Sequence, residues 1–143
     1  IQSYAQAIKY NPTDRYYNLY NTASAYFSLK KYEDALKFYN QALKIDPNKS
    51  DGWNNKGNCL RELKFNKKAL DCYKRAVEID PENSLVWLNM AQTYVLEKDV
   101  KEGLKSLRKA FSIDPSLTQY ASDEEFDTVR DNPEFLKLIR SFS

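Results

Sequence analysis

Residues 42–53 read ALKIDPNKSDGW, and residues 76–87 repeat the pattern as AVEIDPENSLVW. The tripeptide Ile-Asp-Pro occurs a third time at residues 113–115, so its copies are spaced by 34 residues. Asparagine keeps the same interval at Asn21, Asn55 and Asn89. Several residue types that recur at one period indicate an internal repeat. The fold must therefore consist of similar structural units of about this length.

Each period contains two helical patterns. In residues 50–83, apolar or small side chains fall at i, i+4 and i+7 on either side of a break near residues 64–66. They are Trp53, Gly57 and Leu60, then Ala69, Tyr73 and Ala76. Gly57 and Ala76 are small, which predicts that two helices approach closely there. Pro47, Pro81 and Pro115 are expected to end each second helix, because proline lacks an N–H and disfavours a helical residue before it.

This pattern resembles the tetratricopeptide repeat, a helix-turn-helix unit of 34 residues with large and small residues at fixed places. The resemblance implies an all-α fold, a right-handed α-solenoid of stacked repeats. Its positions are filled by Leu19, Ala23, Tyr26, Ala35, Tyr39, Ala42 and Pro47 in the first repeat, and by equivalent residues in the next two. Thr22 and Lys56 stand where the family usually has leucine, Gly103 replaces alanine, and Phe65 lies one place before the usual aromatic residue.

The resemblance divides the chain into a single domain with five parts. Residues 1–15 are expected to be a half repeat, residues 16–49, 50–83 and 84–117 three full repeats, and residues 118–143 capping helices. Ser122 followed by Glu125 is typical of a capping box and predicts that a short helix starts there. Asn132 and Pro133 predict the N-cap and first residue of a last helix. A solenoid needs such a cap to cover its last apolar face.

Composition argues against several functions. Histidine is absent from the 143 residues, so neither a histidine-dependent nucleophile nor a histidine metal site is available, and no catalytic residue, metal or cofactor is predicted. The net charge of +2 disfavours nucleic acid and membrane surfaces as partners. Two cysteines and no apolar run of about 18 residues lead us to expect reduced thiols, no membrane span and a cytoplasmic location.

The resemblance also predicts a binding groove, because first helices line the concave face in this repeat class. Asn21, Asn55 and Asn89 would form a ladder that pairs with the backbone of an extended peptide, similar to the asparagine ladder in the repeats of O-GlcNAc transferase. The same register adds further groove positions: Tyr17, Tyr20, Phe27, Asn54, Asn58, Arg61, Leu85, Leu88 and Gln92. Two other interpretations stay open, namely that the asparagines reflect duplication alone and that the aromatic residues pack within the chain.

We therefore expect a non-catalytic scaffold or adaptor that binds a protein or peptide in the groove. One alternative is self-assembly through repeat ends, as a homo-oligomer formed by the N-terminal half repeat with its Tyr4, Ala7 and Ile8. Another is the regulatory part of a larger enzyme or signalling protein. A chaperone tail is not the expected ligand, because only Asn55 fits the carboxylate clamp of chaperone-binding members.

Overall fold

The computed structural model describes residues 12–143, and every regular element in that range is helical, which confirms the all-α prediction. The chain divides into two compact units, one ending at Ile79 and the other running from Asp80 to Ser143. The predicted half repeat at residues 1–15 falls almost entirely outside the described residues. The expected role of Tyr4, Ala7 and Ile8 therefore stays a prediction.

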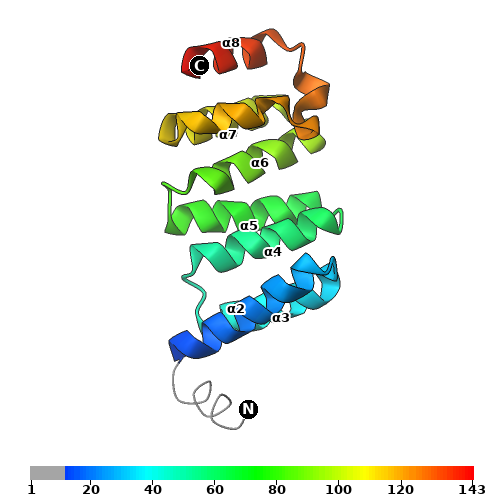
Figure 1. Cartoon of the computed structure of the whole chain (residues 1–143), viewed down its shortest axis with the longest axis vertical. Coiled ribbons are helices and arrows are strands. Elements are labelled where there is room, and N and C mark those ends of the chain that lie inside the picture. The colour runs from blue at the N-terminus through cyan, green and yellow to red at the C-terminus, as the bar shows by residue number, and fades with distance from the viewer. Residues whose placement is uncertain (1–11) are drawn as a thin grey trace. The chain divides into compact units, whose positions relative to one another are not determined.

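The described part of the first unit, residues 12–79, contains four helices that pack in chain order (Figure 1). They are α2 (Pro12–Ser28), α3 (Tyr32–Ile45), α4 (Ser50–Glu62) and α5 (Asn66–Ile79). α2 packs against α3, α3 against α4, and α4 against α5, while α2 also touches α4. The helices meet around small and aromatic side chains, and Ala23, Ala35 and Ala42 are fully buried.

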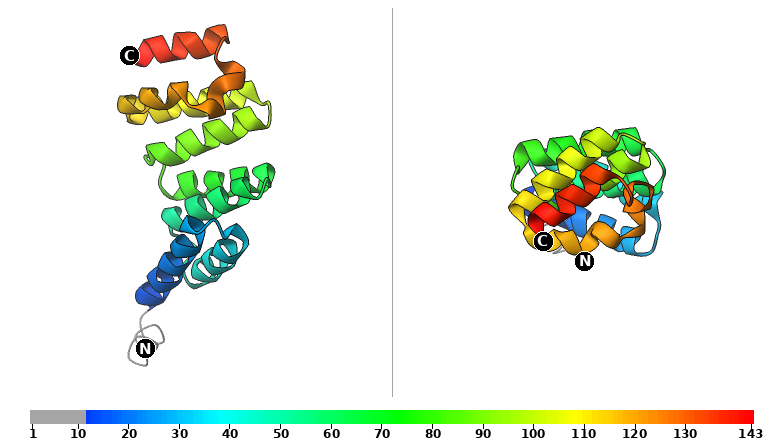
Figure 2. Two further views of the ribbon diagram at one scale, coloured as in Figure 1. Left: turned by 45° about the vertical axis from the view of Figure 1, so that its right-hand side comes forward. Right: turned by 90° about the horizontal axis from the view of Figure 1, so that it is seen from above.

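The second unit begins with α6 (Ser84–Leu96) and α7 (Val100–Ile113), which pack against each other. Two 3₁₀ helices, η1 (Pro115–Ser122) and η2 (Glu124–Val129), then lead to α8 (Pro133–Phe142), as Figure 2 shows in orange and red. Phe126, Val129, Phe135 and Leu138 of these last elements are buried in one apolar core with Leu107 and Phe111 of α7. This part of the chain therefore closes the core of its own unit.

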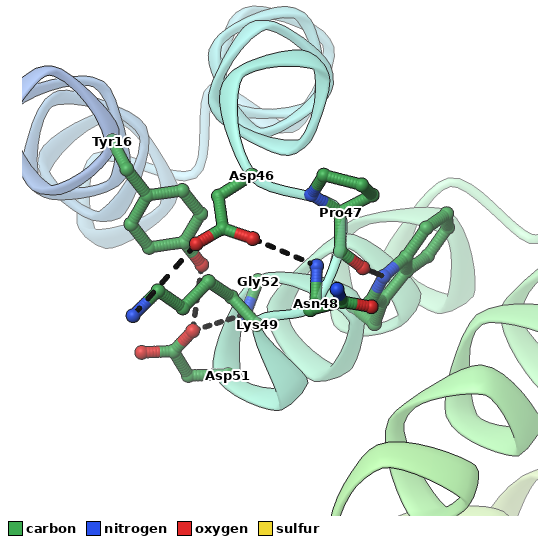
Figure 3. Close-up of polar contacts among 8 residues, drawn as sticks. Tyr16, Asp46, Pro47, Asn48, Lys49, Asp51 and Gly52 are labelled. Carbon is green, nitrogen blue, oxygen red and sulfur yellow. Dashed lines mark hydrogen bonds and ion pairs between the residues drawn. The ribbon is translucent and has the colours of Figure 1, made fainter. Parts of the chain in front are cut away.

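The Ile-Asp-Pro copies end α3, α5 and α7, each of which stops at its isoleucine. The aspartate then folds the turn: Asp46 Oδ1 accepts the N–H of Asn48 at 3.0 Å, and the equivalent bonds at Asp80 and Asp114 are 3.2 and 3.1 Å (Figure 3). The proline carbonyl has a role too. Trp53 Nε1 donates to the oxygen of Pro47 at 2.7 Å, and Trp87 donates to that of Pro81 at 2.8 Å.

The turn inside each repeat depends on a lysine in the left-handed region. Lys30, Lys64 and Lys98 have φ values of 60°, 70° and 64°. In each case the next residue donates its N–H five residues back, as from Phe65 to the oxygen of Leu60 at 2.8 Å, while Lys64 donates to Arg61 at 2.9 Å. This pair of bonds is a Schellman motif, which usually has glycine at the left-handed position.

The close helix approach predicted at Gly57 is confirmed. A Cβ added at Gly57 would lie 2.7 Å from Cε1 of Tyr73, and Ala76 is fully buried. The capping box predicted at Ser122 is wrong. Asp123 is the N-cap residue of η2, and Ser122 Oγ instead donates to the oxygen of Gln119 at 3.4 Å. Asn132 is confirmed as an N-cap, since its Oδ1 accepts the N–H groups of Glu134 and Phe135.

Candidate functional site: the α2–α4 face

Four tyrosines form one cluster on the first unit. Tyr16, Tyr17 and Tyr20 come from α2, and Tyr39 comes from α3. The rings of Tyr16 and Tyr17 lie edge to face at 4.8 Å, those of Tyr16 and Tyr20 stack at 5.9 Å, and those of Tyr20 and Tyr39 meet at 5.6 Å. We call this set the tyrosine cluster. It runs from a surface residue, Tyr17, to buried Tyr39.

Asn55 of α4 holds the cluster from the other side. Its Nδ2 donates a hydrogen bond to the hydroxyl of Tyr20 at 2.6 Å. Burial raises the pKa of Tyr39 to about 12, and hydrogen bonds with Ser24 and Asn55 act in the opposite direction. The bond to Tyr20 fixes the orientation of the Asn55 amide, whose carbonyl oxygen is a hydrogen-bond acceptor.

A second hydrogen bond of this face recurs with the repeat. Ser24 Oγ and the hydroxyl of Tyr39 lie 2.8 Å apart, and 34 residues later the hydroxyl of Tyr73 donates to Asn58 Oδ1 at 2.5 Å. Both pairs link the first helix of a repeat to its second helix. Asn58 is therefore fixed by the core beneath it, although its side chain is only half-buried.

The charged residues of this site are Asp51 and Lys49. Tyr16 donates its hydroxyl proton to Asp51 Oδ1 at 2.6 Å (Figure 3). Lys49 Nζ lies 5.7 Å from the ring centre of Tyr16 and 5.2 Å from that of Tyr17, within cation–π range. Burial, followed by the negative charge of Asp51, raises the pKa of Tyr20, so this phenol stays a neutral hydrogen-bonding group.

The first unit brings eight of the twelve predicted groove residues together on α2 and α4. Asn21 is exposed, and Tyr17 exposes 37% of its surface. Asn54 and Arg61 are half-buried and interact with neighbours in the chain. Phe27 packs edge to face on Tyr32 at 5.2 Å and against the core around Ala23, so its ring serves the fold as well as the surface.

The other four predicted residues lie on α6 in the second unit. Leu85 exposes 54% of its surface. Leu88 exposes only 5% and belongs to the core of this unit, and Gln92 exposes 7%. Neither residue can offer much surface to a ligand. Asn89 is half-buried and interacts within the chain. The continuation of the asparagine ladder to Asn89 stays a prediction.

Sequence reasoning missed Tyr39 and Lys49 as parts of this site. Tyr39 was predicted to fill a packing position, and its hydroxyl points instead to a polar partner on α2. The signal was present: Tyr39 and Tyr73 share one register, and Ser24 and Asn58 share another. Two tyrosines that recur opposite two polar residues indicate a hydrogen bond between them.

Chemistry other than binding finds little support in residues 12–143. No group of three or more cysteine, aspartate or glutamate side chains is placed there to hold a metal. Cys59 and Cys72 are free and buried, and burial raises their pKa to about 12 and about 11, which keeps both thiols protonated and unreactive. None of the described helices combines the length and the apolar character that a membrane crossing requires.

The fold defines a helical-repeat protein, and comparison with known families specifies which kind. Two family models, both described as tetratricopeptide repeat, match the chain: one at residues 16–49 and 50–83, the other at residues 72–105. The chain belongs to the tetratricopeptide repeat family. No curated protein matches it.

Solved structures with the same architecture confirm the solenoid fold class. MamA superposes with a TM-score of 0.78 at 15% identity, over 99% of this chain and 83% of MamA. The Yersinia enterocolitica type III secretion chaperone SycD, in complex with a peptide of the translocator YopD, gives a TM-score of 0.70 at 19% identity over 90% and 92% of the two chains. The TPR2B domain of yeast Sti1, in a complex with pHsp70, gives 0.70 at 21% over 88% and 97%.

Proposed function

We propose that this protein is a non-catalytic interaction module that holds an extended segment of a partner protein against the α2–α4 face. The observation that carries the proposal is the position of Asn55. Its Nδ2 donates to the hydroxyl of Tyr20, so the amide is fixed in orientation and its carbonyl oxygen can accept a backbone N–H whatever the ligand sequence.

The surroundings of Asn55 suit a peptide ligand. Asn21 and Tyr17 are exposed on α2, and the ring of Tyr17 lies edge to face at 6.0 Å with that of Tyr20, the partner of Asn55. Tyrosine supplies a large contact area with little loss of side-chain freedom, which makes it a frequent anchor in interfaces. SycD and Sti1 TPR2B, which share the fold, were solved in complexes with a YopD peptide and with pHsp70, and these complexes support peptide binding here by analogy.

Partner capture followed by binding calorimetry tests the proposal. Proteins that the wild-type chain retains from a lysate would be identified by mass spectrometry. Truncation of such a partner would then give the shortest peptide that still binds. Asn21→Ala should then weaken binding by about 1 kcal/mol while leaving stability nearly unchanged, because Asn21 is exposed. Asn55→Ala should weaken binding by about 1–2 kcal/mol and also lower stability, since the hydroxyl of Tyr20 loses its donor.

Lys74→Ala is the matched control, because Lys74 is exposed on α5 and contributes nothing to the α2–α4 face. A peptide that binds the triple variant Asn21→Ala/Asn55→Ala/Asn89→Ala as tightly as the wild type would exclude the proposal. Light scattering over a concentration series separates it from the alternative of self-assembly, for which mass should rise with concentration in the absence of any peptide.

A further inference from the structure

A second surface lies on the opposite side of α4. Trp53, Lys56 and Leu60 follow one another at i, i+3 and i+7, whereas Asp51, Asn55 and Asn58 of the α2–α4 face occupy the other side of the helix. Between this side of α4 and the helices α3 and α5 is a pocket of about 510 Å³. Its size falls within the range of about 300–1,000 Å³ that is usual for ligand sites. We call it the α3–α5 pocket.

One departure from the repeat pattern lies in the pocket wall. Lys56 stands where the family usually has leucine, and the equivalent residue of the next repeat, Met90, is buried with 4% of its surface exposed. Lys56 is only half-buried, and its Nζ lies 5.1 Å from the ring centre of Trp53. A position that an apolar side chain fills in the third repeat therefore holds an ammonium group beside an indole in the second.

The walls combine apolar surface with positive charge. Leu36, Trp53 and Leu60 supply the apolar part, and Lys56, Lys68 and Arg75 supply three cations against the single carboxylate of Asp71. Arg75 pairs with Glu78 at 3.2 Å. No carboxylate of the described chain lies within 4.0 Å of Lys56 or Lys68 to form an ion pair. These two ammonium groups can therefore receive carboxylates from another molecule.

The hollow continues along α3. A second pocket, of about 430 Å³, shares Leu36 and Asn40 with the first one and adds the cations of Lys37 and Lys44 and the carboxylate of Glu33. The amide oxygen of Asn40, at the junction, is shielded from solvent and accepts no hydrogen bond from the described residues. A basic hollow that continues over two pockets suits a length of peptide chain better than a compact molecule.

We infer that the α3–α5 pocket is a second docking site, which takes an acidic peptide segment of a partner protein. A large apolar side chain of the segment would lie on Trp53 and Leu36, and its carboxylates would face Lys56 and Lys68. Because this surface is on the other side of α4 from Asn55, a module could bind two segments at once, one on each face.

Selection from a phage-displayed library of random 12-residue peptides on the wild-type chain tests the inference. Selected peptides would be measured against Lys56→Glu/Lys68→Glu and against Lys67→Glu/Lys74→Glu, which makes the same charge change at exposed positions of α5 outside both pockets. We expect a class of peptides rich in Asp, Glu and large apolar residues that loses about tenfold or more in affinity on the first variant only. Asn21→Ala should leave that class unaffected.

Two further measurements keep the test independent of folding. Lys56→Met should abolish binding of this class while preserving or raising stability, because methionine would fill the pocket as Met90 fills its own site. In a Trp87→Phe background Trp53 is the single tryptophan, and its emission should shift when a peptide of this class binds. The inference is overturned if no selected peptide distinguishes the two charge variants, if those that do lack acidic residues, or if Lys56→Met binds like the wild type.

Discussion

The hydroxyl of Tyr16 on α2 donates a 2.6 Å hydrogen bond to Oδ1 of Asp51 on α4, joining two helices through residues that are 35 positions apart (Figure 3). The same carboxylate oxygen accepts the N–H of Gly52 at 2.7 Å. A Cβ added at Gly52 would lie 2.4 Å from the Tyr16 oxygen and 2.8 Å from Cδ2 of Leu43. The Tyr16 hydroxyl and the Leu43 side chain thus leave no unstrained space for a side chain at residue 52.

Gly52→Ala is therefore expected to lower the free energy of unfolding by about 1–3 kcal/mol, measured by urea denaturation. Helix propensity alone predicts the reverse, since alanine is favoured over glycine by about 1 kcal/mol. In a Tyr16→Phe background the phenol oxygen is gone, so the added methyl group should cost less. If the two changes lower stability additively, the contact between these residues does not decide the effect.

Gly57 and Gly103 offer a second comparison, because both are buried helical glycines with different neighbours. A Cβ at Gly57 would meet the ring of Tyr73 at 2.7 Å, whereas at Gly103 the nearest atom is Cγ2 of Val95 at 3.0 Å. Tyr73 is fully buried and held by Asn58, so its ring cannot yield. We expect Gly57→Ala to lower the thermal midpoint clearly more than Gly103→Ala, and Gly57→Leu to lower it further. Equal midpoints for both alanine variants would contradict this assignment of the close contact.

The repeat could be predicted from sequence because it depends on local rules. Proline disfavours a helical conformation in the residue before it, so a helix usually stops ahead of a proline. The Ile-Asp-Pro copies accordingly mark the ends of α3, α5 and α7. Asn132 could be predicted as a cap for the same reason, since its oxygen serves N–H groups two and three residues away. Ser122 failed as a cap because η2 begins one residue later than the pattern predicts, with Asp123 and not Ser122 at the N-cap position.

The candidate site was predicted less well because it depends on contacts between distant residues. The repeat register predicts that Asn55 lies in the groove. Its hydrogen bond to Tyr20, however, depends on how closely α2 and α4 approach each other, which the register does not give. Leu88 shares the register of Tyr20 and Asn54, yet it is buried, because α6 packs on the η2 segment that only the second unit contains. Side chains at equivalent repeat positions project from the same side of their helices. Their exposure to solvent, however, depends on which elements pack next to each helix.

Alkaline pH should destabilise the protein. Burial raises the pKa of Cys59 to about 12, of Cys72 to about 11 and of Tyr39 to about 12, from ordinary values of 9.0, 9.0 and 10.0. Between pH 9 and 12 the unfolded chain loses these protons before the folded chain does, so stability falls as pH rises. The slope should approach about 1.4 kcal/mol per pH unit for each group that titrates only in the unfolded state.

Urea denaturation at half-unit steps from pH 8 to 11 measures this slope. Cys59→Ala/Cys72→Ala should flatten it from pH 9 upward, and Tyr39→Phe only above pH 10. Both variants lose packing or hydrogen bonds and should be less stable than the wild type at pH 8, so the slope and not the absolute stability is the readout. A slope that neither variant changes would show that other groups cause the loss.

Lys64 connects α4 to α5 with a φ of 70°, and its backbone bonds show why the chain needs this conformation. Only in the left-handed region can Lys64 and Phe65 both donate their N–H groups back to α4, at 2.9 and 2.8 Å. A residue with a Cβ is strained there by about 1–2 kcal/mol, and glycine is not. Lys64→Gly should therefore raise the free energy of unfolding by about 0.5–1 kcal/mol, after the greater freedom of glycine in the unfolded chain is subtracted.

The control is Lys74→Gly, at an exposed position inside α5, which should lower stability by about 1 kcal/mol because the helix gains nothing from a left-handed residue there. If the two Lys→Gly substitutions change the free energy of unfolding in opposite directions, the cause is the backbone conformation, because both variants lose the same charge. Lys30 and Lys98 have the same conformation and the same pair of bonds, so glycine at all three positions should raise stability in steps, with thermal denaturation as the measurement. If Lys64→Gly destabilises as much as Lys74→Gly, the lysine must stabilise the turn through its side chain.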